Sequence, residues 1–457
     1  MDFLQLISSS QDLIWLFGLA AFFAVVFPLA QSTWLFWKQE EFKEKMPFIL
    51  VELRMPREVR KSPRAMEQIL SAIHALRNFA GDFGELWIDG EITRWYSLEM
   101  VSFGGEVHFY LRMYKKQRDL IEAAFYSYYP DIEIIEVEDY TKRFPKNVGE
   151  LYQRGYDMWG SELMLVREAA YPIKSYLDFE AVDEEKQYDP ISLALEVLGK
   201  IKTEEIIAVQ ILIEPASHTW KNEYKELVEK LRNNEDKQEK ASSGKSSYVR
   251  KIEFEGILPH FPIEKRGEDK KDDFGGLRKS FLRTPGETDV LTAVEENLSK
   301  PAFETIIRFI YFSPKELFYD TFPRRGIMGI FNQYSSSDLN SFIRNEPTAT
   351  RTKIWHWPHI APASRNEYKK QRLMINYRHR EMTHHTFMGK LLTSHRFNFN
   401  FKSKKFIMSN RSIATIFHPP TFIVLTAPHI KRVESRKMGP PAGLPIYGGE
   451  EDIQKYK

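Results

Sequence analysis

One stretch near the N-terminus constrains this chain more than any other. Residues Leu13 to Trp37, LIWLFGLAAFFAVVFPLAQSTWLFW, contain no charged side chain over 25 positions. A helix needs about 20 such residues to cross the hydrocarbon core of a bilayer. Trp15 stands near one end and Trp34 and Trp37 near the other, where aromatic side chains prefer the membrane interface. The stretch therefore predicts a single transmembrane helix over 13–37.

A cleaved secretory signal is the main alternative for this stretch. Such a signal carries Lys or Arg before its apolar run, which is usually about 7–15 residues long. Here residues 1–12 contain only two charges, Asp2 and Asp12, and the apolar run is longer. A buried core helix rarely stays uncharged over this length. The membrane anchor is therefore the favoured interpretation.

Lys and Arg beside the stretch predict its orientation. None precedes it, whereas Lys38, Lys43, Lys45, Arg54 and Arg57 follow it closely. The positive-inside rule then places the N-terminus outside and the bulk of the chain in the cytoplasm. The absence of cysteine agrees with a reducing compartment. We expect a single-pass protein of the inner (cytoplasmic) membrane.

The segment after the anchor, residues 46–140, has the element order of a ferredoxin-like domain. An apolar strand at 47–55 precedes a helix at 63–79, which Ser62 and Pro63 begin by a common capping pattern. Residues 106–113 alternate apolar and polar side chains, which is the period of a strand. The remaining elements are predicted as a strand at 91–103, a Gly104-Gly105 turn, a helix at 115–129 and a strand at 131–137. The resulting order, β-α-β-β-α-β, is that of the split βαβ fold.

Residues 160–430 predict a second α+β domain of the same kind. Strands are expected at 162–169, 205–213, 303–312 and 422–425, with helices at 189–198, 220–232, 284–298 and from Lys315 onward. A polar insertion without periodicity interrupts it at 233–279, and the Pro- and Gly-rich residues 435–457 predict a flexible tail. The sequence thus predicts an α+β protein, with one N-terminal transmembrane helix followed by two ferredoxin-like units, the second with a large insertion.

No motif in the chain predicts catalysis. The phosphate-binding loop GxxxxGK[ST] is absent, because the Gly275–Ser280 segment lacks its spacing. The HExxH and GxSxG patterns of zinc hydrolases and esterases are absent from the sequence as well. His384, His385 and His395 lie near one another in sequence, but adjacent histidines are not a specific ligand spacing. We therefore predict no catalytic residue, no metal and no cofactor, and expect that the protein is not an enzyme.

The residues from Arg351 to Arg411 are strongly basic. They include fourteen Lys or Arg and only two acidic residues, Glu367 and Glu381. Basic side chains attract phosphates, and interleaved aromatics such as Trp355 offer faces on which bases stack, so the segment is a candidate for binding DNA. A solvated surface, anionic lipid beside the anchor and an acidic partner protein are the alternatives. The candidate binding residues are Arg351, Lys353, Lys369, Lys370, Arg372, Arg378, Arg380, Lys402, Lys404 and Lys405.

Several runs of the sequence resemble one family. PFILVELRMPREVRKSPRAMEQILSAIHALR, WYSLEMVSFGGEVHFYLR and YYPDIEIIEVEDY are followed in order by ELYQRGYDMWGSELML, YDPISLALEVLGKI, LTAVEENLSKPAFETIIRFIYFSPKE, ATIFHPP and GPPAGLP. From Pro47 to Pro445 the chain thereby resembles the membrane-anchored N-terminal region of HerA-like ATPases of candidate-phyla bacteria. Those ATPases are similar to the coupling ATPases of type IV secretion and conjugation.

That resemblance implies a place in a membrane transfer machine. In many relatives the ATPase follows the GPPAGLP-type linker, whereas this sequence ends at Lys457. We therefore expect either a separate motor ATPase as partner or a trimmed form of the longer protein. The expected function is a non-catalytic, membrane-anchored platform of a type IV secretion-like or conjugative DNA transfer machine, assembled as a homo-oligomer. The rival interpretation is a membrane-tethered scaffold that binds anionic lipid or protein partners and has no role with nucleic acid.

Overall fold

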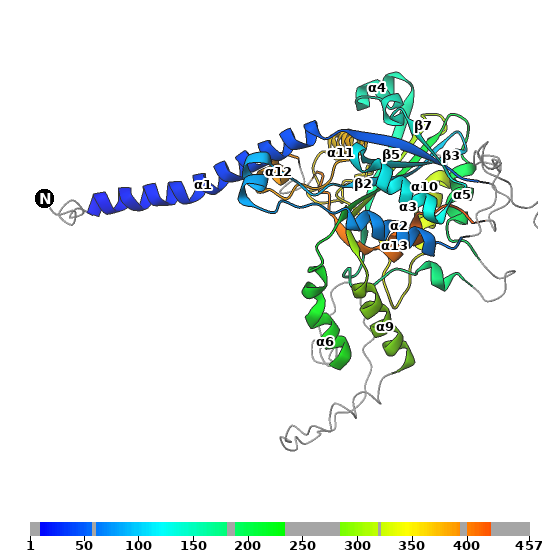
Figure 1. The fold of residues 1–457 in the computed structure, drawn as a ribbon. Helices are drawn as coiled ribbons and strands as arrows, with labels where there is room; N and C mark the ends of the chain where they lie inside the picture. The colour runs from blue at the N-terminus through cyan, green and yellow to red at the C-terminus, as the bar shows by residue number, and fades with distance from the viewer. Residues whose placement is uncertain are drawn as a thin grey trace, which may run out of the picture.

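The protein is a mixed α+β molecule in which a long N-terminal helix projects from a body built on an antiparallel sheet (Figure 1). The structure, a computed structural model, describes residues 10–56, 61–180, 188–233, 284–318, 321–393 and 400–421. Three predicted features lie outside the described residues: the strand at 422–425, all but the first residue of the insertion at 233–279, and the tail at 435–457.

The N-terminal helix α1, Ser10–Lys45, is 36 residues long. At a rise of 1.5 Å per residue it extends over about 54 Å. From Trp15 to Gln31 every side chain is exposed, so only the later turns of α1 meet the described part of the body. The length and hydropathy of α1 suffice to cross a membrane, as predicted, and a signal sequence would meet the same criterion.

The first half of the sheet comes from the segment predicted as the first ferredoxin-like domain. Its strands are joined antiparallel in the order β4-β1-β3-β2, and its two predicted helices are confirmed. Gly104 and Gly105 have positive φ in the turn between β2 and β3, as a tight hairpin requires. The elements are β1 (Phe48–Arg54), α2 (Arg64–Ala75), β2 (Tyr96–Phe103), β3 (Glu106–Tyr114), a 3₁₀ turn (Lys115–Gln117), α3 (Arg118–Tyr128) and β4 (Glu133–Val137).

The second half of the sheet has the strand order β6-β7-β5-β8, again antiparallel throughout. Helices α6 and α9 extend from β6 and β7 and lie side by side, joined by an ion pair of 2.7 Å between Arg232 and Glu295 (Figure 1). The elements are β5 (Tyr156–Leu165), α5 (Ser192–Gly199), β6 (Ile206–Pro215), a 3₁₀ turn (Trp220–Tyr224), α6 (Lys225–Asn233), α9 (Pro285–Ser299), β7 (Ala302–Pro314), α10 (Thr321–Asn332) and β8 (Phe342–Arg344).

The two halves are joined through strands β2 and β6. These strands pair antiparallel from Tyr96 opposite Ile213 to Phe103 opposite Ile206. The segments predicted as separate domains at 46–140 and 160–430 therefore share one continuous sheet, to which β9 (Phe406–Ser409) adds beside β7. One apolar cluster contains buried side chains from both halves, so the two halves share a core.

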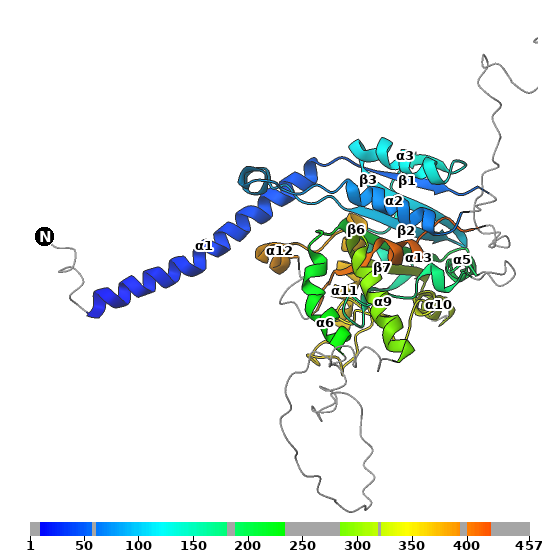
Figure 2. The same cartoon turned by 60° about the horizontal axis from the view of Figure 1, so that its bottom comes forward.

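One face of this sheet is covered by α2, α3, α5, α10 and α13 (Asn410–Ile416) (Figures 1 and 2). A single apolar core lies beneath them and includes Ile69 of α2, Phe125 of α3 and Phe331 of α10, none of which is exposed. Full burial of such side chains stabilises the fold by about 1.5–3 kcal/mol each. This face therefore supplies most of the hydrophobic stabilisation.

The opposite face carries two smaller apolar clusters with polar side chains between them. Ala208 and Ile310 belong to the first cluster, and Leu212 and Ile306 belong to the second, which lies beside the end of α1. Gln210 and its cross-strand partner Arg308 lie between these rows. The elements over this face are a 3₁₀ turn (Tyr140–Arg143), α4 (Val148–Gln153) and α11 (Pro362–His379).

Two predicted strands begin elsewhere than expected. β2 starts at Tyr96 rather than Glu91, because the side chain of Asn78 binds the backbone of Ile92 and Arg94 in place of a partner strand. β5 starts at Tyr156, six residues before its predicted start. Gly160 and its polar neighbours interrupt the apolar pattern, yet the long strand β7 pairs with the whole run.

A buried aspartate fixes the end of the described chain to α5. Asp189 accepts hydrogen bonds from His418 Nε2 at 2.9 Å and from the backbone and hydroxyl of Thr421 at 2.8 and 2.7 Å. Burial alone would raise the pKa of Asp189, but the charge of His418 and these hydrogen bonds lower it to about 2. The carboxylate therefore stabilises the folded state wherever it is ionised.

Replacing Asp189 by Asn should lower the free energy of unfolding by about 2 kcal/mol at neutral pH. A lowered pKa adds stability that is complete above the unfolded value of 3.8 and is lost as the pH falls toward 2. The difference between D189N and the native chain should therefore shrink between pH 5 and pH 2. Urea unfolding of the detergent-solubilised chain, followed by circular dichroism, measures it. Asp131→Asn, at an exposed site, is the control, and an equal difference at all pH values would contradict the prediction.

Candidate functional site

The structure divides the basic residues predicted to bind a partner into buried and surface groups. Arg380, Lys369 and Lys370 are only 1, 2 and 5 % exposed. Lys369 donates to the carbonyl oxygen of Glu346 at 3.1 Å, and Lys370 donates to the carboxylate of Asp157 at 2.7 Å. These cations are bound inside the protein, so they are not available to a ligand in this structure.

The other predicted basic residues lie nearer the surface. Lys405 is half-buried and is paired with the carboxylate of Glu304. Those that remain exposed or half-buried are Arg351, Lys353, Arg372, Arg378, Lys402 and Lys404. The basic surface is therefore smaller than the charge of residues 351–411 suggests.

A row of polar side chains crosses the sheet beneath α11. Glu99 of β2 lies opposite Gln210 of β6, which lies opposite Arg308 of β7, which lies opposite Glu162 of β5. All four residues are fully buried. Buried charges destabilise a fold unless they are paired and hydrogen-bonded, so this row depends on its partners.

Arg380 is the partner of Glu99. The guanidinium donates to Glu99 from Nε at 2.7 Å and from Nη2 at 3.1 Å, and Nη1 donates to Asp139 at 2.6 Å. The hydroxyl of Tyr140 donates to the same carboxylate at 2.6 Å. Burial alone would raise the pKa of Glu99, but the charge of Arg380 and these hydrogen bonds hold it below its usual value. Glu99 is therefore an ionised, fully enclosed carboxylate.

Arg308 of β7 also joins the sheet to the end of α11, but here the arginine lies in the sheet. Its Nε donates to Glu162 at 2.6 Å, while Nη1 and Nη2 donate to the carbonyl oxygens of Asn376 and Glu381 at 3.2 and 2.5 Å. The last carbonyls of a helix lack partners within it, and a cation there is favourable. Arg308 thus fixes the C-terminus of α11 to the second half of the sheet, as Arg380 fixes it to the first.

This ionic row was missed at the sequence level. The signal was present, because Glu99, Gln210 and Arg308 each lie between two apolar neighbours inside a strand. Ser97 of the same strand donates a hydrogen bond to Glu99, but the charged partners of the row come from other strands and from the end of α11, which only the fold brings together.

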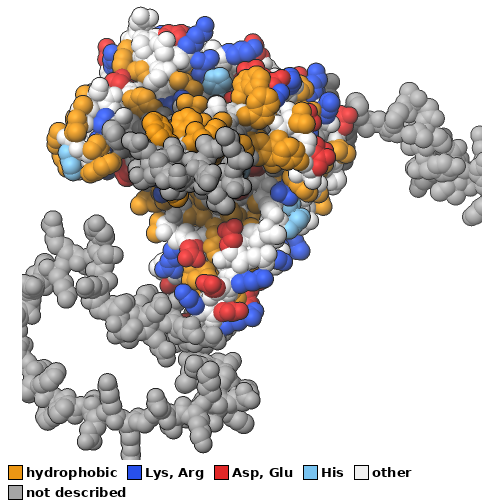
Figure 3. Space-filling model, turned by 90° about the vertical axis from the view of Figure 1, so that its left-hand side faces the viewer, with side chains coloured by type: hydrophobic (Ala, Val, Ile, Leu, Met, Phe, Trp, Pro, Cys, Tyr) orange, Lys and Arg blue, Asp and Glu red, His pale blue; other side chains and the backbone are white. Residues whose placement is uncertain are grey.

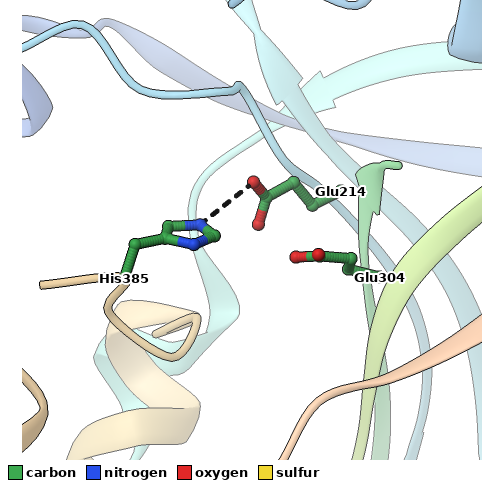
Figure 4. Close-up of side chains that lie close together, drawn as sticks. All are labelled: Glu214, Glu304 and His385. Atoms are coloured by element: carbon green, nitrogen blue, oxygen red, sulfur yellow. Dashed lines mark ion pairs between the residues drawn. The ribbon is translucent and has the colours of Figure 1, made fainter. Parts of the chain in front are cut away.

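A second group of charges lies two rows further along the same face, beyond Leu212 and Ile306. Glu214 and Glu304 are cross-strand partners on β6 and β7, and His385 Nε2 lies 3.5 Å from the carboxylate of Glu214 (Figure 4). One ligand atom from each of the three residues lies within 4.8 Å of the others. Imidazole and carboxylate are both zinc ligands. Lys405, paired with Glu304, also lies 3.4 Å from His385, so a metal ion would have to displace its ammonium group.

Of the three histidines considered as ligands in the sequence, the two that the structure describes lie in different contacts. His384 packs against Phe36 of α1, at 5.2 Å between ring centroids, and forms an ion pair of 2.7 Å with Glu381. His385 belongs to the group with Glu214, and His395 lies outside the described residues. The two glutamates were not predicted because about ninety residues separate them in the chain.

An open cavity of about 270 Å³ lies between α9 and α13. Its two cations already have partners, because Arg411 pairs with Glu296 at 2.6 Å and Lys300 pairs with Glu67 at 2.8 Å. The cavity wall is therefore held together by ion pairs between elements.

The last turns of α1 are clamped by two segments of the body. On one side, Ser32 Oγ accepts a hydrogen bond of 2.9 Å from the backbone of Met388 in α12 (Phe387–Leu392). On the other, Trp34 Nε1 donates at 2.9 Å to the carbonyl of Trp87 in a short π-helix (Glu85–Asp89). Contact positions two residues apart lie about 200° apart around a helix with 3.6 residues per turn. The two segments therefore hold α1 from opposite sides.

Two glycines allow this close approach. At Gly90, with φ of +71°, a Cβ atom would come within 2.5 Å of the backbone of Lys38. At Gly389 a Cβ atom would come within 2.8 Å of the ring of Phe36. Lys43, one turn further along α1, lies 3.5 Å from the carboxylate of Glu381. The later turns of α1 are thus built into the body by backbone, apolar and ionic contacts.

Replacing Arg380 by Met should lower the free energy of unfolding by about 3–5 kcal/mol, because it leaves Glu99 buried without its charge partner. The double variant E99Q/R380M should regain part of that loss, since no unpaired carboxylate then remains at that position. Arg378→Met, two residues away at a half-buried site, is the matched control and should change little. Denaturant unfolding of the detergent-solubilised chain measures all three. Equal losses in R378M and R380M would contradict the assignment.

Replacing Lys405 by Met should leave Glu214 and Glu304 facing each other and lower the free energy of unfolding by about 1 kcal/mol. Zn²⁺ should then restore stability, because it can take the place of the lost ammonium group among two carboxylates and an imidazole. Thermal melts with and without Zn²⁺ measure both effects. H385A/K405M should lose the response to zinc, and Lys404→Met, at an exposed site, should show neither effect.

Comparison with known proteins adds a family to this geometry. No curated protein matches the chain. A family model described as a domain of unknown function, DUF8128, matches residues 37–429, which include both halves of the sheet and the two segments of the body that contact α1. Because the match covers most of its 457 residues, the chain belongs to the DUF8128 family.

Proposed function

We propose that the chain is a non-catalytic, membrane-anchored platform that docks a separate motor ATPase of a type IV secretion-like or conjugative transfer machine. The observation that carries the proposal is the clamp on α1. A platform must hold its body at a defined distance and direction from the membrane, and contacts at Ser32, Trp34 and Lys43 do this. A protein that only needed a tether would have no use for a helix built into its body.

The charge distribution supports a cytoplasmic body in this proposal. Lys38, Lys43 and Lys45 lie in the last turns of α1, and positive charge beside a membrane span favours the cytoplasmic side. Lys38 also lies 5.6 and 5.1 Å from the ring centroids of Trp34 and Trp37, an arrangement common where a helix leaves a membrane. The N-terminus is then outside and the sheet inside.

We further propose that each half of the sheet is a ferredoxin-like unit. Counted within each half, both strand orders read fourth, first, third, second. In both halves a helix follows the first and the third strand, and these four helices, α2, α3, α5 and α10, contribute to the same apolar core. The paired edges β2 and β6 are the second strands of their units, so the arrangement supports a duplicated unit joined edge to edge.

The partner surface in this proposal is formed by the basic residues that remain accessible. Arg351, Lys353, Arg372, Arg378, Lys402 and Lys404 are exposed or half-buried. They could contact the transported DNA strand or an acidic surface of the motor, and both contacts weaken as salt increases. The buried cations Lys370 and Arg380 serve the fold instead.

Reversing the charge of these six residues to Glu should release a P-loop ATPase that co-purifies with the tagged native chain. Reversing six exposed lysines elsewhere, at Lys115, Lys116, Lys142, Lys146, Lys200 and Lys221, should leave co-purification unchanged. Binding of the detergent-solubilised protein to single-stranded DNA over a salt series separates the DNA contact from the motor contact, because only the former carries a steep salt slope. Absence of any ATPase from the native preparation would contradict the docking role. A reporter at Lys457 found outside the cytoplasm would contradict the orientation.

A further inference from the structure

Exposed apolar side chains surround α1 where it enters the body. They belong to the two clamping segments, which lie on opposite sides of the helix, and Figure 3 shows hydrophobic side chains gathered on this face of the molecule. Phe83 is 73 % exposed, Ile88 63 % and Leu392 58 %. We call the set formed by Phe83, Ile88, Phe387, Leu391 and Leu392 the collar.

The clamp fixes the level of the collar along α1. Met388 of α12 is bonded to Ser32, and Trp87, whose ring stacks on that of Phe83 at 5.9 Å, is bonded to Trp34. Gly90 touches the backbone of Lys38. Both sides of the collar therefore lie beside residues 32–38, where the charge-free stretch of α1 ends.

This level coincides with a membrane boundary. The uncharged stretch Leu13–Trp37 has 25 residues, of which a bilayer core needs about 20. If the core ends at Trp37, Ser32 and Trp34 lie about 5–8 Å inside it at 1.5 Å per residue. If the core ends five residues earlier, the same residues lie among the headgroups. Interfacial helices insert about 5–10 Å into this boundary, so either position brings the collar into it.

The charges of the collar segments select the kind of contact. Asp82 accepts from the backbone of Glu85 at 2.8 Å, and Glu85 accepts from the backbone of Gly81 at 2.6 Å. Asp89 is exposed beside Ile88. These three carboxylates outnumber the single cation of α12, Lys390, so the collar segments carry no net attraction to anionic lipid. The contact therefore depends on apolar burial and needs only a zwitterionic bilayer.

We propose that the collar inserts into the interface of the leaflet on the body's side, so that the protein holds the membrane by a span and a surrounding apolar ring. The proposal rests on α1 crossing the membrane, which is part of the proposed function. The collar lies directly beside the uncharged stretch of α1, so whatever covers the collar must also surround this helix. A bilayer that α1 crosses meets this condition. Two turns of α1 and two separate segments of the body then share one lipid boundary.

The absence of cysteine from the chain allows a direct test. Single cysteines replace Phe83, Ile88 or Leu392 of the collar, Val26 in the middle of α1, or Tyr126, which is 42 % exposed on α3. Each full-length variant carries an environment-sensitive fluorophore and is reconstituted into phosphatidylcholine vesicles. Lipid-borne nitroxides near the headgroup or near the acyl-chain end, and aqueous iodide, serve as quenchers. Circular dichroism melts confirm that each labelled variant is folded.

We expect the shallow nitroxide to quench the three collar labels several-fold more than the Tyr126 label, and iodide to show the reverse order. The label at position 26 should respond most to the deep nitroxide. Collar labels as open to iodide as the Tyr126 label, with position 26 still in the acyl chains, would overturn the collar and leave the anchor standing. Position 26 open to iodide would overturn both. Collar labels shielded from iodide and from lipid nitroxides alike would show that protein, such as a second copy, covers this face, and would also overturn the proposal. Because the collar labels lie on two separate segments, a single misfolded variant leaves the test intact.

Discussion

Two arginines join the C-terminal end of α11 to the sheet. Arg308 of β7 donates to the carbonyl of Asn376 in the last turn of α11 and to that of Glu381 just after it. Arg380, the residue that follows α11, donates to Glu99 of β2. The connection continues outward, because the residue whose carbonyl binds Arg308, Glu381, also lies 3.5 Å from Lys43 of α1. A path of charged contacts therefore leads from the centre of the sheet to α1. Loss of either arginine would disturb both the core and the position of α1.

A buried row of charges adds little to the free energy of unfolding, since apolar residues of similar size in the same place are often equally or more stabilising. The row has a clearer effect on which strands pair and in which register. Glu99, Gln210, Arg308 and Glu162 face one another on a single face of four strands. A slip of one residue between any two of these strands would turn a charged side chain into the apolar core on the opposite face. The row thus opposes mispairing at the junction between the two halves, where long apolar strands alone would tolerate a shift.

Much of the architecture follows from the sequence, because periodicity and capping residues are local signals. The long apolar helix α1, the hairpin at Gly104 and Gly105, and the helices α2, α3, α5 and α10 were predictable in this way. The pairing of β2 with β6 was not predictable, since no feature of either strand's sequence indicates which strand it pairs with. The basic segment shows the limit most clearly. Its composition predicts a charged surface, but Lys370 and Arg380 are drawn inward by Asp157 and Glu99, which lie more than two hundred residues away in the chain.

The clamp also has a consequence for the direction in which the body faces. Ser32 and Phe36 contact one segment, and Trp34 and Lys38 contact the other, so each face of α1 has its own partner. The direction in which the body faces around the axis of α1 is therefore set by helical phase. One residue added to α1 between Val26 and Ser32 would advance that phase by about 100° and move the body by about 1.5 Å along the helix. The register of this one helix thus decides which edge of the sheet the body presents on a given side of α1.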